Sequence, residues 1–103
     1  MKVSLLYFDD CPNWQVADAR LAEALRLTGH TDQQVEYLLV TSDEQAQALN
    51  FVGSPTVLIN DEDPFRSDEA RAFGLTCRVY RTATGLAGSP SIGEFVAAIS
   101  ACA

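Results

Sequence analysis

The strongest constraint on the fold is a helix-like segment that lies between two nearly continuous apolar runs. The runs cover Val3–Phe8 and Val35–Val40, and such runs are typical of strands whose two faces are both covered. Between them, apolar residues recur on one helical face from Trp14 to Thr28, and Gly29 follows where helices favour a left-handed residue. Because two strands joined by a helix form a βαβ unit, we expect these strands to be parallel, with a right-handed crossover.

The rest of the chain predicts a short helix, two more strands and a final helix. The short helix and the final helix each open with a capping box, in which a serine caps the helix and a Gln or Glu three residues later bonds back. We expect the short helix at 42–50, where it buries Ala46 and Leu49, and the final helix from Ser91, where it buries Phe95, Val96 and Ile99. Between them we expect a strand at 56–60, two turns of helix at 67–73, an edge strand at 77–81 and a turn at 85–90. No linker or repeat interrupts this series, so we expect residues 1–103 to form one α/β domain of order βαβαββα.

Charge and cysteine content argue against several functional classes. Seven basic residues against 14 acidic ones give a formal net charge of −7, which disfavours nucleic acid or an anionic membrane surface as a partner. No apolar run approaches the roughly 20 residues that span a bilayer, and the N-terminus lacks a secretory pattern, so we expect a cytoplasmic protein. Three cysteines are too few for a disulfide framework. The excess of Arg over Lys and the abundance of Ala are typical of a bacterial sequence.

Cys11 has the best-defined chemical environment in the sequence. It follows the first predicted strand, at the edge of an open α/β sheet where ligands usually bind, and Pro12 then occupies a favoured first-turn position of the helix. Unpaired N–H groups at the start of a helix stabilise an anion, so they favour the thiolate of Cys11. The carboxylates of Asp9 and Asp10 oppose this effect, and we expect a modest net stabilisation.

Three features together resemble the thioredoxin-like superfamily. Cys11-Pro12-Asn13-Trp14 directly follows the first strand, Ser54-Pro55-Thr56 precedes the third, and a glycine-rich turn precedes the last helix. The resemblance covers the whole chain and implies a glutaredoxin-sized, three-layer α/β/α fold with a four-stranded mixed sheet in the order 2-1-3-4. It also implies a cis peptide bond before Pro55, facing Cys11. The sequence departs from the family pattern where Trp14 replaces the second cysteine of Cys-x-x-Cys.

The resemblance implies that Cys11 is a catalytic nucleophile and that a substrate groove surrounds it. The groove residues are Pro12, Asn13, Trp14, Ser54, Pro55 and Ser91. Trp14 also fits the core face of its helix, Asn13 is expected at an exposed position, and Ser91 is expected to cap its own helix unless it binds a substrate carboxylate. No residues have the spacing of a metal site, and the single histidine, His30, is expected in a loop.

The leading functional hypothesis is a monothiol thiol–disulfide oxidoreductase, in which Cys11 attacks a disulfide and a second thiol releases it. Its partner is a small thiol or a protein disulfide, and it needs no cofactor beyond glutathione or another low-molecular-weight thiol. Cys77 is not expected to resolve the mixed disulfide, because the expected topology places it roughly 16 Å away at ~3.3 Å per residue, and a disulfide needs Cα atoms within about 7 Å. Cys102 lies near the end of a helix that runs away from Cys11.

Two alternative functions stay open at this point. One is a thioredoxin-like binding module without turnover, which is favoured by the loss of the second cysteine, by the acidic flank and by the lack of a histidine near Cys11. The other, weaker alternative is the handling of soft metals or organomercurials, because a lone activated thiolate binds such ions well. The separated cysteines offer no obvious chelate for that role.

Overall fold

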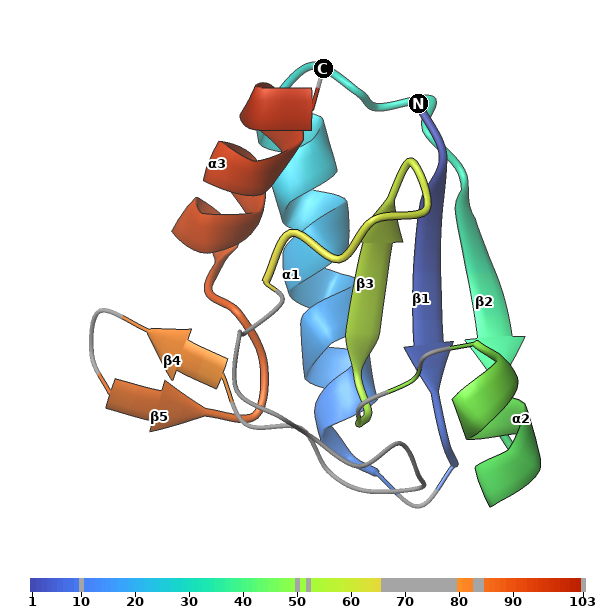
Figure 1. Ribbon diagram of the computed structural model, residues 1–103. Coiled ribbons are helices and arrows are strands. Elements are labelled where there is room, and N and C mark those ends of the chain that lie inside the picture. The colour runs from blue at the N-terminus through green and yellow to red at the C-terminus, as the bar shows by residue number, and fades with distance from the viewer. Residues whose placement is uncertain (10, 50, 52, 66–79, 83–84, 103) are drawn as a thin grey trace.

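Three strands form a mixed sheet with β1 (Val3–Tyr7) in the middle. The computed structural model describes residues 1–9, 11–49, 51, 53–65, 80–82 and 85–102. β2 (Val35–Leu39) runs parallel to β1, and β3 (Thr56–Ile59) runs antiparallel to it on the other side (Figure 1). The parallel pair of the βαβ unit and the relative order 2-1-3 of these strands are therefore as predicted.

Helices lie on both faces of this sheet. α1 (Asn13–Leu27) and α3 (Ile92–Cys102) pack together on one face, and the short α2 (Asp43–Ala48) belongs to the other (Figure 1). Since successive residues of a strand point to opposite faces, β1 reaches both layers: Leu5 is buried with α1 and α3, and Leu6 with α2. None of the helices described here is long and apolar enough to cross a membrane.

The predicted apolar faces of the two longer helices form most of the larger core cluster. The side chains that α1 and α3 bury in it are Ala17, Leu21, Ala24, Leu25, Phe95 and Ile99, and Val96 packs against them from a half-buried position. α1 ends close to the predicted place, with Thr28 as its C-cap residue and Gly29 at φ 81°. The left-handed conformation that the sequence predicts at this glycine is therefore confirmed.

One of the two predicted capping boxes forms completely, and the other forms only in its serine half. Ser91 Oγ accepts a hydrogen bond from the Glu94 N–H at 3.2 Å, and Glu94 Oε1 accepts one from the Ser91 N–H at 2.9 Å, so both halves form. Ser42 Oγ accepts from the Gln45 N–H at 3.1 Å, whereas Gln45 Oε1 accepts from the N–H of Thr41 at 2.8 Å, one residue before the cap. The glutamine therefore holds the incoming chain rather than the cap residue itself.

Leu49 corrects one prediction of the core. It was expected to be buried by the helix at 42–50, but it is 38% exposed. The reason is that α2 ends at Ala48, which makes Leu49 the C-cap residue and takes it off the buried helical face. Phe51, which is fully buried in the same cluster as Ala46, fills the core at this position.

A second, two-stranded sheet lies apart from the first. β4 (Tyr80–Thr82) pairs antiparallel with β5 (Gly85–Ala87). The sequence predicted an edge strand at 77–81, of which 77–79 lie outside the described residues, as does the helix predicted at 67–73. It also predicted a turn at 85–90, and this is wrong for 85–87, because Gly85–Ala87 pairs with β4 as a strand.

Leu21→Ala and Leu27→Ala compare a buried and an exposed leucine of the same helix. Leu21 is fully buried, whereas Leu27 is 55% exposed. Removing the buried side chain leaves a cavity, so Leu21→Ala is expected to lower the free energy of unfolding by about 2–5 kcal/mol. Leu27→Ala is expected to change it by less than about 0.5 kcal/mol. Urea denaturation measures both values, and similar losses in the two variants would contradict the assigned core.

Candidate functional site

Cys11 lies in a tight turn between β1 and α1. Its N–H donates a hydrogen bond to the carbonyl oxygen of Phe8 at 3.2 Å, and its side chain is fully buried. The exposed Pro12 is the N-cap residue of α1, with φ −68°, and no side chain caps this end of the helix. The first-turn N–H groups of α1 are therefore not consumed by a side-chain cap next to Cys11, which leaves them able to stabilise negative charge.

Ser54 connects the turn at Cys11 to the segment that precedes β3. The Cys11 thiol donates a hydrogen bond to the Ser54 carbonyl oxygen at 3.4 Å, and the Phe8 N–H donates one to Ser54 Oγ, also at 3.4 Å. Ser54 is itself fully buried, and the Ser54–Pro55 peptide bond is cis, as expected. The structure thus brings together Cys11, Ser54 and Pro55, which are far apart in the sequence.

Tyr80 also forms a hydrogen bond to this segment. Its hydroxyl donates a hydrogen bond to the carbonyl oxygen of Pro55, and its buried ring packs edge-on against Phe65, with the ring centroids 5.8 Å apart. The sequence predicts no role for Tyr80 at the site. The only local signal was its apolar place in the alternating pattern of the predicted edge strand, which indicates burial but names no partner.

Trp14, three residues after Cys11, stacks on Tyr7. The two ring centroids are 4.3 Å apart and the ring planes differ by 28°. Trp14 is half-buried and packs against the larger core cluster. The interpretation that Trp14 packs on the core is therefore confirmed, and its role beside a substrate stays a prediction.

Asn13 corrects the expectation of an exposed position. It is half-buried, because the chain at Gly88 passes directly over its side chain: a Cβ built on Gly88 would lie 2.8 Å from Asn13 Oδ1 and closer still to Nδ2 and Cγ. The two residues that follow Gly88, Ser89 and Pro90, are buried, and Arg20 Nη1 donates a hydrogen bond to the Pro90 carbonyl oxygen at 3.2 Å. Only a residue without a Cβ fits at Gly88 while Asn13 keeps its conformation.

Ser91 uses its polar groups within its own helix. Its hydroxyl and its N–H both belong to the capping box with Glu94. A cavity of about 430 Å³ lies beside it, with Arg20 among its lining residues. The self-capping interpretation therefore accounts for the observed contacts of Ser91.

The other residues considered in the sequence lie away from Cys11 or outside the described chain. His30 follows α1, and its Nδ1 is 3.0 Å from Thr28 Oγ1. Cys77 lies outside the described residues. Cys102 ends α3, at the edge of the molecule opposite to the one where β1 ends (Figure 1). In the part of the chain that the structure describes, no three His, Cys, Asp or Glu residues are grouped in a way that could hold a metal ion.

Gly88→Ala tests the close approach of the chain to Asn13. The added methyl group overlaps the Asn13 amide, so the variant is expected to lose about 1–3 kcal/mol of unfolding free energy. Gly93→Ala is the matched control, because the nearest atom to its built Cβ is Ser91 Oγ at 4.0 Å, and alanine is favoured over glycine in a helix by about 0.5–1 kcal/mol.

The double variant Asn13→Ala/Gly88→Ala isolates the contact itself. Removing the amide removes the overlap, so the double variant is expected to regain most of the stability that Gly88→Ala loses. Urea denaturation of the four proteins in this cycle provides the comparison. Strictly additive losses would show that Gly88 and Asn13 do not meet.

Since comparisons with known proteins found no match, the function of this site has to be argued from its geometry. No protein-family model, no curated protein and no solved structure matches this chain. The features that remain to be interpreted are a buried thiol, a backbone carbonyl that accepts a hydrogen bond from it, and the uncapped start of a helix, all at one edge of the sheet.

Proposed function

We propose that this protein is a monothiol thiol–disulfide oxidoreductase with Cys11 as its nucleophile. The observation that carries the proposal is the position of the Cys11 sulfur, which lies at the uncapped start of α1 and within 3.4 Å of the Ser54 carbonyl oxygen. Cys11, the Ser54 carbonyl and the start of α1 lie at the edge of the sheet where an α/β protein usually binds its ligand. The proposal includes a thioredoxin-like fold. Of the fourth strand expected at 77–81, residues 77–79 lie outside the described residues, and Tyr80 and Arg81 pair with β5 in the second sheet.

The proposed reaction exchanges one disulfide for another in two steps. The Cys11 thiol loses its proton to solvent, and the thiolate attacks one sulfur of a disulfide R–S–S–R′, which forms Cys11–S–S–R and releases R′–S⁻. A low-molecular-weight thiol, as its thiolate R″–S⁻, then attacks the sulfur of the R group, which forms R–S–S–R″ and returns Cys11 as a thiolate. Two electrons pass from the small thiol to the substrate disulfide, and no other oxidant or reductant is needed.

Trp14 supports the monothiol form of this reaction. Its indole occupies the position from which a second motif cysteine would attack the mixed disulfide, and it is held there by stacking on Tyr7 and by contact with the core. The thiol that completes the cycle therefore has to come from another part of the chain or from solution. A glutathione-like thiol from solution meets this requirement without a second cysteine of the chain near Cys11.

The burial of Cys11 supports a second candidate function, a binding module without turnover. The Cys11 side chain has no exposed surface, and its thiol donates to a backbone carbonyl, as a purely structural cysteine also does. In this case Cys11 contributes to the link between the turn after β1 and the segment before β3. The two candidates differ in one property, which is whether the sulfur exchanges with disulfides in the native protein.

Cys11→Ser separates the two candidates. A serine hydroxyl can donate to the same Ser54 carbonyl, so the variant is expected to fold, but it cannot form a mixed disulfide. With a glutathione mixed disulfide as substrate and glutathione as reductant, the native protein is expected to turn over and Cys11→Ser to fall to the uncatalysed rate. Cys102→Ser is the matched control, because α3 ends at the far edge of the molecule (Figure 1), and it is expected to retain full activity.

Mass spectrometry of the native protein provides an independent measurement. After brief exposure to iodoacetamide, the oxidoreductase proposal expects alkylation at Cys11 without prior unfolding. If Cys11 is protected and the native protein shows no turnover, the oxidoreductase proposal is wrong and the binding module stands. If Cys11→Ser remains as active as the native protein, Cys11 is not the nucleophile.

A further inference from the structure

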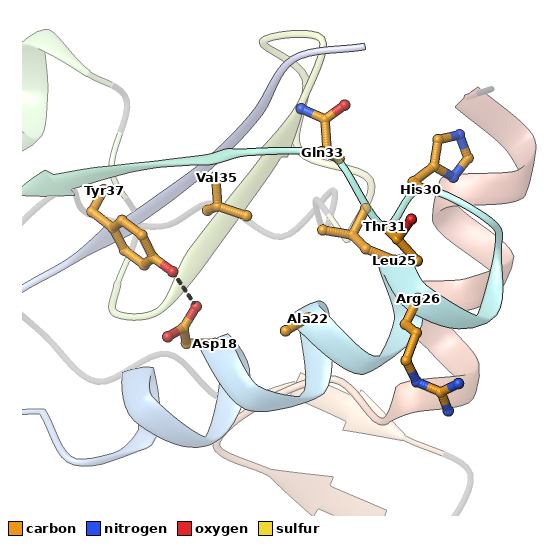
Figure 2. Close-up of a pocket in the computed structure, with 9 residues that line it drawn as sticks. All are labelled: Asp18, Ala22, Leu25, Arg26, His30, Thr31, Gln33, Val35 and Tyr37. Carbon is orange, nitrogen blue, oxygen red and sulfur yellow. Dashed lines mark hydrogen bonds between the residues drawn. The ribbon is translucent and has the colours of Figure 1, made fainter.

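A second cavity, of about 420 Å³, lies between α1 and β2. The helix residues Asp18, Ala22 and Leu25 face it because residues three and four apart share one side of a helix. The strand residues Val35 and Tyr37 face it because alternate residues share one side of a strand. Figure 2 shows these two rows of side chains facing each other across the cavity. Its volume is within the range of small-molecule sites in proteins.

The cavity is apolar in its middle and acidic at one end. Ala22, Leu25 and Val35 form the apolar part. At the acidic end, the Tyr37 hydroxyl donates a hydrogen bond to Asp18 Oδ1 at 2.7 Å. A carboxylate has about four acceptor positions, so this bond leaves most of the Asp18 acceptor capacity unused. Within the described ranges, Asp18 has no ion-pair partner.

Tyr37 adds a neutral donor to this end rather than a second charge. The hydrogen bond to Asp18, together with partial burial, raises the pKa of Tyr37 to about 12. The phenol therefore stays protonated at neutral pH. Tyr37 is 50% exposed as a residue, and its ring is of the kind that attracts organic cations.

The basic residues at the other end do not form an anion site. Arg26 forms an ion pair with Glu23, with Nε donating to Glu23 Oε2 at 3.0 Å, and Figure 2 shows its side chain extending away from β2. His30 Nδ1 is 3.0 Å from Thr28 Oγ1, and its ring points away from the cavity (Figure 2). Among the charged groups that line the cavity, Asp18 is therefore the one that faces an incoming ligand without a counter-ion.

We propose that the cavity between α1 and β2 binds a small organic amine in its protonated form. The ammonium group donates to the Asp18 carboxylate beside the Tyr37 ring, and the apolar body of the amine lies against Ala22, Leu25 and Val35. The formal net charge of −7 adds a general attraction for cations. This site involves neither Cys11 nor Ser54, so it is independent of the proposed redox function.

Hexylamine, hexanol and hexanoate test this proposal, because they share a chain length and differ in charge. Titration of the isotope-labelled protein with each compound, followed by the shifts of its backbone amide signals in NMR spectra, reports both affinity and location. Hexylamine is expected to bind saturably, with the largest shifts at residues 18–25 and 33–37, and hexanoate is expected not to bind there. Equal affinities for hexylamine and hexanol, or saturable shifts located elsewhere, would overturn the proposal.

Asp18→Asn and Glu36→Gln supply the matched pair of variants. Asparagine retains an oxygen that accepts from Tyr37 but removes the charge, so hexylamine affinity is expected to fall about tenfold or more, as for the loss of a charged hydrogen-bond partner. Glu36→Gln removes the same charge from an exposed residue that neighbours Tyr37 in β2 and points to the opposite face, and it is expected to leave the affinity unchanged. Equal affinities in the two variants would show that Asp18 does not hold the amine.

Discussion

The position of β1 between two strands of opposite direction determines where the chemistry of this chain lies. β1 runs parallel to β2 and antiparallel to β3, so the end of β1 and the start of β3 meet at the same sheet edge. Leu6 pairs with Thr56 in this register, which places the next residues of β1 beside the segment before β3. The contact between the Cys11 thiol and the Ser54 carbonyl follows from this pairing. Neither residue could reach the other if β3 ran in the opposite direction.

Features that depend on local periodicity could be predicted from the sequence, whereas those that depend on long-range contacts could not. The strands of the first sheet, α1 and the two serine caps follow from apolar patterns and capping chemistry that a few adjacent residues contain. Leu49 fits a helical pattern, but the pattern does not show that α2 ends one residue earlier. Asn13 is half-buried because the chain at Gly88 passes over its side chain. No feature near either residue in the sequence indicates that the two are in contact.

The candidate site shows the same division between local and long-range information. A helix start next to Cys11 can be predicted from Cys11-Pro12 alone. The sequence predicts Pro12 in the first turn, whereas the structure makes it the N-cap residue, and its side chain has no polar atom to cap the helix. The approach of Ser54 was expected only from the resemblance to a family, since nothing in the residues themselves pairs the two segments. Neither the local sequence pattern nor the family resemblance predicts the hydrogen bond from Tyr80 to Pro55. It depends on where the chain returns after residue 79, and strand alternation cannot indicate that.

The two functional candidates for Cys11 follow from one chemical property of the site. A sulfur that forms a mixed disulfide next to Trp14 has no thiol at that position to resolve it, because the indole is fixed by Tyr7 and by the core. The lifetime of the adduct is then set by the concentration of the external thiol, since exchange is a bimolecular reaction. Under the proposed function, abundant small thiol lets the site turn over, and scarce thiol leaves the partner bound. The proposed cycle then depends on an external thiol because Trp14 stands where a second cysteine would make the cycle self-contained.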